Sequence, residues 1–343
     1  MKIVVLNETS KIIVMEFKAF LVQEEDNKYT AKVTTLTTDQ LPEGDVLVKV
    51  NYSSLNYKDA LSYSGNKGVT RQFPHVPGID AVGVVETSAS EKFKKGEQVL
   101  ITGFDLGMNT WGGYGEYIRV PEKWVLPLPN GMSAYEAMCY GTAGLTAGLS
   151  VMKVVEAGVR PEDGPVVVSG ATGGVGSLSV VILAHLGYEV VAISGKDAHN
   201  LLVDQLGAKE VVSRTDFEEQ YNSRAMAKTV FAAGIDTVAG GILSGMIKSV
   251  KYNGIVTCCG MVAGINLETS IFPFILRGAT LAGVDSVECS VEQRQKVWNH
   301  LATDWKPKTL QQLVEQISID QLEEKLNVLL QGEAKGRYLL AHH

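Results

Sequence analysis

The 343-residue sequence has only four cysteines, and their spacing fits neither a metal site nor a disulfide framework: Cys139, Cys258, Cys259 and Cys289. The adjacent pair, Cys258 and Cys259, lies inside an apolar run, so we interpret both as packed strand residues rather than a redox pair. Sparse cysteine use of this kind is typical of proteins in a reducing compartment. We therefore expect a cytoplasmic protein.

The sequence also lacks long apolar runs and a basic stripe. The apolar stretch at the N-terminus is too short for a signal peptide, and no later run is long enough to span a bilayer. Its 31 basic and 38 acidic residues give a formal charge of −7, and the acidic residues are scattered. Nucleic-acid binding needs a clustered basic surface. We therefore expect neither a membrane nor a nucleic-acid partner.

Short alternating runs broken by turn residues fill the first third of the chain. The runs that predict half-buried strands lie at residues 46–52, 78–86, 96–102 and 114–120. Many short strands separated by glycine and proline are typical of an antiparallel, barrel-like domain. We assign this domain to residues 15–135 and give residues 1–14 no role beyond an N-terminal extension.

The pattern changes near residue 133, where helical runs begin to alternate with strands. The strand candidates are residues 166–169, 189–193, 210–212, 234–238, 254–258 and 280–284. Such alternation predicts a parallel sheet covered by helices, so the fold class is α/β. We assign this second domain to residues 136–286. The last fifty residues, with two predicted helices and a strand, could close either domain, and we assign residues 287–343 to the first.

A glycine-rich turn, Gly170-Ala-Thr-Gly-Gly-Val-Gly176, separates a strand ending at Ser169 from a helix beginning near Gly174. Glycine lets a backbone approach a pyrophosphate closely, and free amide groups at a helix start face the anion. Tight strand–helix turns also use glycine for packing alone. A preceding strand and a following helix in a unit of βαβ size favour a dinucleotide site.

The end of the next strand chooses between NAD and NADP, because a carboxylate there holds the ribose hydroxyls of NAD. The strand tip reads Ser194-Gly195-Lys196, and the first acidic residue, Asp197, follows the lysine. Ser194 can donate a hydrogen bond, Gly195 exposes its amide, and Lys196 supplies charge. Arg214, after the next strand, is a second candidate cation for a 2′-phosphate. Although both cations could be solvated loop charges, we expect NADPH.

Motifs outside the glycine turn also appear in a recognisable order. They are Ser53-Ser-Leu-Asn-Tyr-Lys-Asp59, Phe73-Pro-His-Val-Pro-Gly-Ile-Asp80, Trp111-Gly-Gly113, Gly141-Thr-Ala-Gly-Leu-Thr-Ala147, and Pro273-Phe-Ile-Leu-Arg-Gly278 with Gly283-Val-Asp-Ser286. Together they resemble the medium-chain dehydrogenase/reductase superfamily, and within it the YhdH/YhfP-type quinone oxidoreductases. That branch includes the bacterial acrylyl-CoA reductases. The resemblance implies a GroES-like catalytic domain followed by a Rossmann NADP-binding domain.

The zinc ligands of alcohol dehydrogenases in this superfamily have no counterparts here. The first ligand segment, residues 55–59, has no cysteine, Gly-His-Glu is replaced by Gly78-Ile-Asp80, and the third ligand position matches Met138. Cys139 is one place off, and a lone thiol cannot assemble a site that needs three protein ligands. We interpret His75, between two prolines, as a packed loop residue. The resemblance therefore implies a zinc-independent enzyme.

A hydride acceptor without a metal must already be polarised by its own carbonyl, which an activated alkene provides. Hydride would reach the β-carbon, while the protein orients the reactants, stabilises the enolate oxygen and excludes water. Tyr57 is the leading residue to contact the nicotinamide or donate to the enolate, although it could be an aromatic packed at a domain boundary. The expected reaction is acrylyl-CoA to propanoyl-CoA. The alternatives are a quinone or alkenal reductase and a non-catalytic NADPH-binding protein.

Further contacts follow from the resemblance. The cofactor residues that it implies are Thr172, Gly173, Gly174 and Val175 at the pyrophosphate turn, and Met261, Ile275 and Ser286 near the nicotinamide. Composition alone would place Met261 and Ile275 in a core. Basic residues available for CoA phosphates are Lys67, Arg71, Lys248 and Lys251. The strand at 280–284 resembles an edge that pairs between subunits, so we expect a homodimer.

Overall fold

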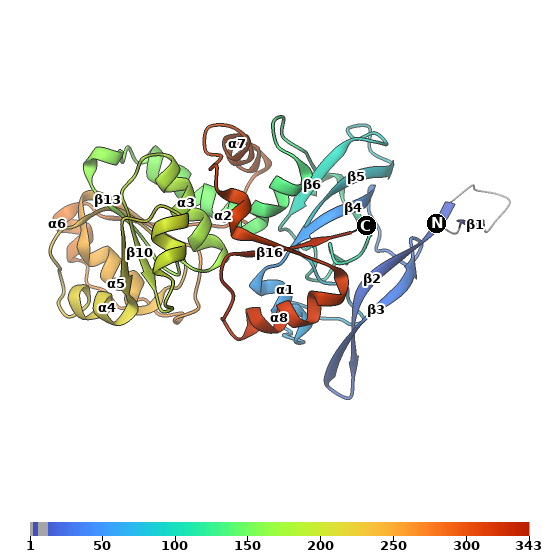
Figure 1. Cartoon of the computed structure of the whole chain (residues 1–343), viewed down its shortest axis with the longest axis horizontal. Helices are drawn as coiled ribbons and strands as arrows, with labels where there is room; N and C mark the ends of the chain where they lie inside the picture. The colour runs from blue at the N-terminus through green and yellow to red at the C-terminus, as the bar shows by residue number, and fades with distance from the viewer. Residues whose placement is uncertain (1–2, 6–12, 343) are drawn as a thin grey trace. The chain divides into compact units, whose positions relative to one another are not determined.

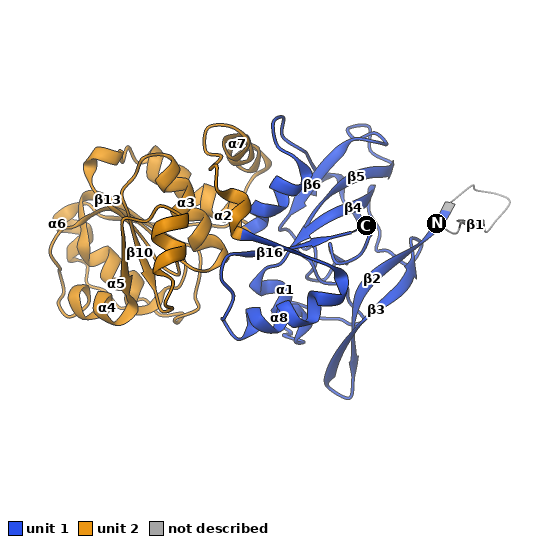
Figure 2. Cartoon of the chain, in the orientation of Figure 1, with its two compact units in different colours: residues 1–142, 314–343 blue, residues 143–313 orange. Residues whose placement is uncertain are grey.

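The structure is a computed structural model that describes residues 3–5 and 13–342 of the chain (Figure 1). Two compact units divide the chain, as Figure 2 shows by colour. Unit 1 comprises residues 1–142 and 314–343, and unit 2 comprises residues 143–313. The polypeptide therefore leaves unit 1 once and returns to it for its last thirty residues.

Unit 1 contains two β-sheets. The smaller one joins β1 (Ile3–Val5), β2 (Ile13–Glu25) and β3 (Lys28–Thr37) in an antiparallel arrangement. The larger sheet has seven strands: β4 (Val46–Ser54), β5 (Asp80–Ser88), β6 (Gln98–Thr102), β7 (Tyr117–Val120), β8 (Leu126–Pro127), β15 (Val314–Ile317) and β16 (Arg337–Ala341). Its order is β15-β16-β4-β5-β6-β8, with β7 also paired to β4. Only β15 and β16 pair in parallel among these strands.

Alternating apolar residues build the core of the larger sheet. Val46, Val48 and Val50 of β4 are buried and pack in one cluster with residues of neighbouring strands, among them Val85, Val99, Ile101 and Ile118. Burying one such side chain stabilises the fold by about 1.5–3 kcal/mol. The period-two pattern read from residues 46–52 is therefore confirmed as a half-buried strand.

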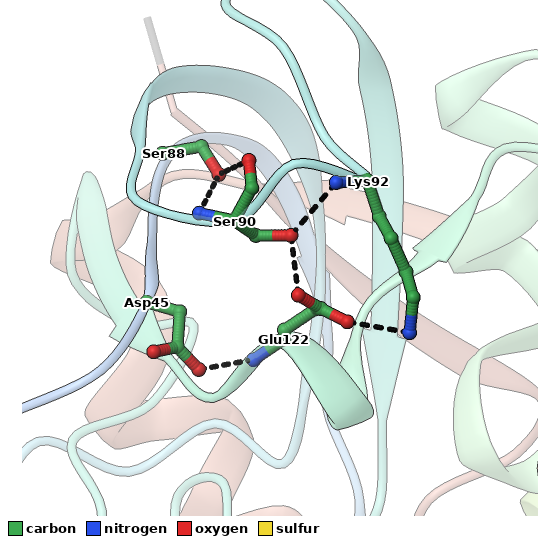
Figure 3. Close-up of polar contacts among 5 residues, drawn as sticks. All are labelled: Asp45, Ser88, Ser90, Lys92 and Glu122. Carbon is green, nitrogen blue, oxygen red and sulfur yellow. Dashed lines mark hydrogen bonds and ion pairs between the residues drawn. The ribbon is translucent and has the colours of Figure 1, made fainter.

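Polar side chains fasten the loop after β5 to the 3₁₀ turn η1 (Glu122–Trp124), as Figure 3 shows. Ser90 Oγ donates to the Glu122 carboxylate and accepts from the Lys92 amide at 3.0 Å. The Glu122 amide donates to Asp45 Oδ2 at 2.9 Å. Lys92 Nζ lies 2.6 Å from Glu122 Oε1, but its side chain is 76% exposed, so this ion pair contributes little stability. The cluster is a loop anchor on the surface.

The helices of unit 1 are short. They are α1 (Tyr57–Tyr63) and α8 (Leu322–Leu330), together with the 3₁₀ turns η1 and η5 (Ile319–Gln321). The long helix α2 (Ala134–Glu156) is interrupted at Gly141, which has φ 54° and ψ −156°. A Cβ on Gly141 would lie 2.2 Å from Ser54 Oγ. The division between the units falls one residue after this kink.

Unit 2 is built on one parallel sheet with the order β11-β10-β9-β12-β13-β14. Its strands are β9 (Val166–Val168), β10 (Val190–Ser194), β11 (Glu210–Ser213), β12 (Phe231–Asp236), β13 (Val250–Cys258) and β14 (Thr280–Gly283). Its helices include α3 (Gly174–His185), α4 (Arg214–Tyr221), α5 (Gly240–Ser249), α6 (Phe272–Arg277) and α7 (Val291–Ala302). The short turns are the π-helix η3 (Asn200–Gln205) and the 3₁₀ turns η2 (Pro161–Asp163) and η4 (Leu310–Leu313). The strands follow one another outward from β9 on one side and from β12 on the other. This is the strand order of dinucleotide-binding Rossmann sheets, and it confirms the predicted α/β class.

The contact-based units differ from the predicted domains in two segments. Residues 136–142 group with unit 1, and residues 287–313, which contain α7, group with unit 2. Packing explains the second difference, because Gly148 of α2 lies so close to α7 that an added Cβ would be 2.4 Å from Val297 Cγ1. In the described part of the chain, no helix combines the length and apolar character that a membrane crossing requires.

Candidate functional site

The glycine turn after β9 packs backbone against backbone. Gly170 has φ 57°, and a Cβ there would lie 2.3 Å from Thr237 Oγ1. A Cβ on Gly176, in the first turn of α3, would lie 2.2 Å from the Gly170 carbonyl oxygen. Side chains do not fit at such distances, so both positions require glycine. The turn therefore offers backbone, not side chains, at the start of α3, as a pyrophosphate cradle needs.

Buried hydrogen bonds under the turn link β9 to β12. Ser169 Oγ donates to Asp236 Oδ1 at 2.7 Å and accepts from the Thr237 amide at 2.8 Å. Thr237 Oγ1 in turn donates to the Ser169 carbonyl at 3.0 Å, and the Ala239 amide donates to Asp236 Oδ2 at 2.8 Å. Burial raises the pKa of Asp236, although these donors oppose the rise. The network fixes the strand end from which the turn starts.

The residues predicted to choose between NAD and NADP lie at the adjacent ends of β10 and β11. Ser194 Oγ accepts from the Lys196 amide and donates to the Lys196 carbonyl, both at 3.0 Å, which closes a tight turn. A Cβ on Gly195 would lie 2.6 Å from Arg214 Nε, so the guanidinium rests against the Gly195 backbone. Ser194 pairs with Ser213 across the strands, immediately before Arg214. Unit 2 thus brings Ser194, Gly195 and Arg214 together.

The other predicted cofactor residues of unit 2 differ in exposure. Thr172 is buried, and Gly173, Gly174 and Val175 are half-buried at the start of α3. Met261 and Ile275 are 70% and 65% exposed, so they are not core residues as composition alone would suggest. Ser286 is buried and accepts a hydrogen bond from Thr146 Oγ1 at 2.7 Å.

Tyr57, the predicted catalytic residue, lies in unit 1 as the first residue of α1. Its side chain is among the exposed large hydrophobic groups, at 48%. Asn56 precedes it as the helix N-cap in an extended conformation, with φ −131° and ψ 157°. An exposed aromatic at a helix start can contact a ligand, whereas a packed core aromatic cannot.

Asn56, the residue before Tyr57, belongs to a buried polar network that local sequence patterns do not predict as part of a site. Asp80 Oδ2 accepts from Asn56 Nδ2 at 2.8 Å, from the Thr142 amide at 2.9 Å, and from Ser54 Oγ. Thr142 Oγ1 donates to the other carboxylate oxygen at 2.5 Å. Asp80 is fully buried, so these donors replace the water that an ionised carboxylate would otherwise bind.

Asp59 is a second buried carboxylate of the network. Its Oδ1 accepts from the amides of Gly78 and Ile79 at 3.1 and 2.8 Å, and its Oδ2 accepts from the Asn56 amide at 2.8 Å. Burial, and next the charge of Asp80, raise the pKa of Asp59 to about 7, although the hydrogen bonds oppose the rise. Asp59 therefore holds the start of α1 against the loop before β5.

Arg337, at the start of β16, closes the network. Its Nη2 donates to Ser54 Oγ at 2.8 Å and to the Tyr140 carbonyl at 3.3 Å, and its Nη1 donates to the Leu55 carbonyl and to Asn56 Oδ1, each at 3.2 Å. Burial lowers the pKa of the guanidinium, and the charge of Asp80 opposes that effect. Arg337 lies 281 residues from Asn56, so no local pattern could reveal the contact.

Within residues 3–5 and 13–342, no three His, Cys, Asp or Glu side chains are grouped as a metal site. His75 is buried, and its Nε2 has no hydrogen-bond partner among the described residues. Burial lowers the pKa of His75 to about 4 and raises that of Cys139 to about 12. Both side chains are therefore neutral, packed groups, as we interpreted His75 from sequence.

Three of the four cations considered for CoA phosphates are occupied inside their own unit. Lys248 Nζ donates to Asn222 Oδ1 at 2.5 Å, and Lys251 Nζ donates to the Asp163 carbonyl at 2.6 Å. Lys67 Nζ lies 2.7 Å from Glu24 Oε2. Arg71 is exposed, and its side chain has no hydrogen bond or ion pair within the described residues.

Known proteins match both units. Residues 42–130 match the family described as alcohol dehydrogenase GroES-like domain, and residues 174–303 match the family described as zinc-binding dehydrogenase. The Escherichia coli (strain K12) protein AcuI, named provisionally as an acrylyl-CoA reductase, is 43% identical over 94% of this chain and 99% of its own length. YhfP of Bacillus subtilis (strain 168), named provisionally as a quinone oxidoreductase, is 38% identical over 94% of this chain and 98% of its own length.

Solved structures agree with these relatives. The yhdH oxidoreductase from Salmonella enterica, in complex with NADP, superposes with a TM-score of 0.91 at 40% identity, over 96% of this chain and 100% of that chain. The Bacillus subtilis yhfP structure, with NAD bound, gives a TM-score of 0.93 at 38% identity, with coverages of 96% and 100%. The predicted GroES-like and Rossmann architecture is thereby confirmed. The chain belongs to the medium-chain dehydrogenase/reductase superfamily of oxidoreductases, in its YhdH/YhfP branch.

Proposed function

We propose that the protein is an NADPH-dependent reductase of activated alkenes that converts acrylyl-CoA to propanoyl-CoA. The observation that carries the proposal is the end of β10 in unit 2, where the Arg214 guanidinium lies against Gly195. The glycine turn after β9 has no room for a side chain at Gly170 or Gly176. The 43% identity to the protein named AcuI, over nearly the whole of both chains, supports the choice of substrate.

The residues of unit 2 fit a dinucleotide. The turn at Gly170 and Gly176 has no room for a Cβ, so its backbone is open to a pyrophosphate. We propose that the cofactor is held by Thr172, Gly173, Gly174 and Val175 at the pyrophosphate, by Ser194, Gly195, Lys196 and Arg214 at the 2′-phosphate, and by Met261, Ile275 and Ser286 near the nicotinamide. When bound, NADPH supplies a hydride.

The choice of NADPH over NADH rests on this chain's own residues, because relatives at similar identity are seen with NADP and with NAD. A guanidinium at the strand tip pairs well with a phosphate. The first acidic residue, Asp197, follows Lys196 instead of ending the strand, where it would bind ribose hydroxyls. These features favour the cofactor that carries the extra phosphate.

In unit 1, Tyr57 is proposed to orient the acceptor, either by contacting the nicotinamide or by donating its hydroxyl proton in a hydrogen bond to the enolate oxygen. Such a donor stabilises charge that develops in the transition state. We also propose that the enzyme works without zinc, since Ile79 and Met138 carry no ligand atom for that metal and Cys139 is buried as a neutral thiol.

The test is NADPH oxidation, followed by absorbance, with acrylyl-CoA and 1,4-benzoquinone offered separately and NADH run in parallel. We expect rapid oxidation of NADPH with the thioester and formation of propanoyl-CoA. The quinone reductase alternative, which the name of YhfP favours, requires turnover of the quinone without turnover of the thioester. NADPH binding without turnover of either compound would identify a non-catalytic binding protein.

We further propose a homodimer formed through β14, at the edge of the unit 2 sheet. An unpaired edge strand exposes backbone hydrogen-bonding groups that a second strand can satisfy. Exposed apolar side chains in the same unit, among them Ile271, Phe272 and Leu276, would lose contact with water in such a pairing. Light scattering should give the mass of two chains, and a monomer would contradict the proposal.

A further inference from the structure

We propose that Asn56 is a positioning residue, which acts on the reaction by fixing the place of Tyr57. This inference rests on the proposed function, in which Tyr57 touches the nicotinamide or the substrate. Tyr57 needs such support because its side chain is 48% exposed and has no hydrogen bond within the described residues. Its location is therefore set by the backbone at the start of α1.

Asn56 uses its main-chain groups to fix that backbone. Its amide donates to Asp59 Oδ2 at 2.8 Å, and its carbonyl accepts from the Asp59 and Ala60 amides at 3.0 and 3.3 Å. These bonds define the first turn of α1, in which Tyr57 is the first residue. A helix of seven residues has little stability of its own, so this turn depends on its anchor.

The side chain of Asn56 ties the same turn to the buried charges of unit 1. Its Oδ1 accepts from Arg337 Nη1 at 3.2 Å, and its Nδ2 donates to Asp80 Oδ2 at 2.8 Å. The amide dipole therefore points its oxygen at a cation and its nitrogen at a carboxylate. Asp80 and Arg337 are 0% and 4% exposed, so these contacts are made away from water, where they are strongest.

Neither aspartate nor leucine reproduces this arrangement at position 56. Aspartate has the same shape but lacks the donor, and it would place a third carboxylate beside Asp59 and Asp80. Leucine would leave the guanidinium and the carboxylate each without a partner, at a cost in stability. The neutral amide of Asn56 thus bonds to a cation and to a carboxylate. Because both of these groups are buried, they fix the position of Asn56 and of the next residue, Tyr57.

The test is a double-mutant cycle with Asn56→Ala, Tyr57→Phe and the double variant, assayed with whichever acceptor the wild type reduces. Because small displacements of a reacting group can lower rates about 100-fold, we expect each single variant to lose kcat by about 10- to 100-fold. If Asn56 acts through Tyr57, the double variant loses little more than Tyr57→Phe alone. Equal, multiplicative losses would show independent action and overturn the proposal.

A second readout needs no turnover. With 3-fluorotyrosine incorporated in place of Tyr57, the fluorine NMR signal should be a single narrow line, and Asn56→Ala should broaden or split it. The control is Asn51→Ala, five residues earlier in β4, because the Asn51 side chain has no hydrogen-bond partner in the described structure. An unchanged fluorine signal in Asn56→Ala would overturn the positioning role.

Should Asn56→Ala fail to fold, the exchange Asn56→Asp with Asp80→Asn keeps one amide and one carboxylate facing each other. We expect this exchange to recover part of the kcat lost in Asn56→Asp, and no recovery would count against the amide bridge.

Failure of the proposed function and failure of the positioning role of Asn56 give different results. If the wild type reduces no acceptor, the proposed function fails, and if Tyr57→Phe is fully active, the hydrogen bond from the Tyr57 hydroxyl fails. If Tyr57→Phe is impaired and the cycle is multiplicative, only the role of Asn56 fails.

Discussion

The glycine turn of unit 2 and the polar network of unit 1 solve opposite problems. The turn depends on the absence of side chains, because the backbone atoms of Gly170 and Gly176 pack directly against each other. The network depends on side chains that are present, because Asn56 bonds both to Asp80 and to Arg337, which come from distant parts of the chain. The turn consists of seven consecutive residues, whereas Asn56 and Arg337 of the network are 281 residues apart in the chain. The comparison predicts that a larger side chain in the turn weakens NADPH binding, and that loss of a polar side chain from the network destabilises unit 1.

The largest effect on cofactor binding should come from Gly176→Ala. The new Cβ would lie 2.2 Å from the Gly170 carbonyl oxygen, so the turn must open, and we expect NADPH affinity to fall by at least about 100-fold. Fluorescence titration with NADPH measures the loss. Gly187→Ala is the control, because its Cβ would meet nothing within 4 Å, although its φ of 86° should cost about 1 kcal/mol of stability. Unchanged NADPH affinity in Gly176→Ala would contradict the cradle.

Arg337→Met tests the other side of the comparison. Removal of the cation leaves Asp80 buried without its counter-charge and Asn56 without a donor to its Oδ1, so we expect unit 1 to lose about 3–5 kcal/mol of stability. Urea unfolding followed by a unit 1 probe would report the change. Arg160→Met, at an exposed ion pair with Glu162, should leave the urea midpoint nearly unchanged. If both substitutions lowered the free energy of unfolding equally, the buried network would stabilise unit 1 no more than an exposed ion pair does.

The pKa of Asp59 predicts a pH dependence of smaller size. The folded-state pKa of about 7 is above the ordinary 3.8, so the folded protein binds a proton more tightly than the unfolded chain. The free energy of unfolding should therefore fall as pH rises from about 4 to 7, by about 2–4 kcal/mol relative to Asp59→Asn, which does not titrate. Urea midpoints at intervals over that range measure the difference. A constant difference would mean that the hydrogen bonds to Asp59 keep its pKa at the ordinary value.

Lys196→Ala should have the smallest effect, about a tenfold loss of NADPH affinity with NADH affinity unchanged, because only the 2′-phosphate would lose a charged partner. Arg214→Ala is the companion variant, since that guanidinium rests against Gly195. Titration with both reduced cofactors separates the contributions. Equal weakening of NADPH and NADH would show that Lys196 does not read the phosphate.

The same contrast explains how much could be predicted from sequence. The turn at Gly170, the strand end at Ser194 and the period-two strand β4 depend on neighbours in the chain, so local sequence patterns predict each of them. Strand β3 is not among the predicted strands, because Lys28–Thr37 is mostly lysine and threonine, its apolar alternation is limited to Tyr29–Val33, and only one of its residues is buried.

Long-range features of the site were beyond sequence reasoning for a physical reason. Asp59 and Asp80 stand inside motifs that we recognised, but only the fold shows that Asn56 and Arg337 join them. Ser286 was identified by resemblance, whereas its partner Thr146, 140 residues away, was not. The grouping of α7 with unit 2 likewise depends on its packing against Gly148, which a pattern of helices and strands cannot reveal.

The most direct measurement of the proposed reaction follows the position of the transferred hydrogen. NADPH deuterated at the reactive face of C4 is incubated with acrylyl-CoA and the enzyme, and the propanoyl-CoA formed is examined by proton NMR and mass spectrometry. We predict one deuterium on the β-carbon, and in heavy water a solvent deuterium on the α-carbon. No propanoyl-CoA, or cofactor deuterium on the α-carbon, would contradict the account.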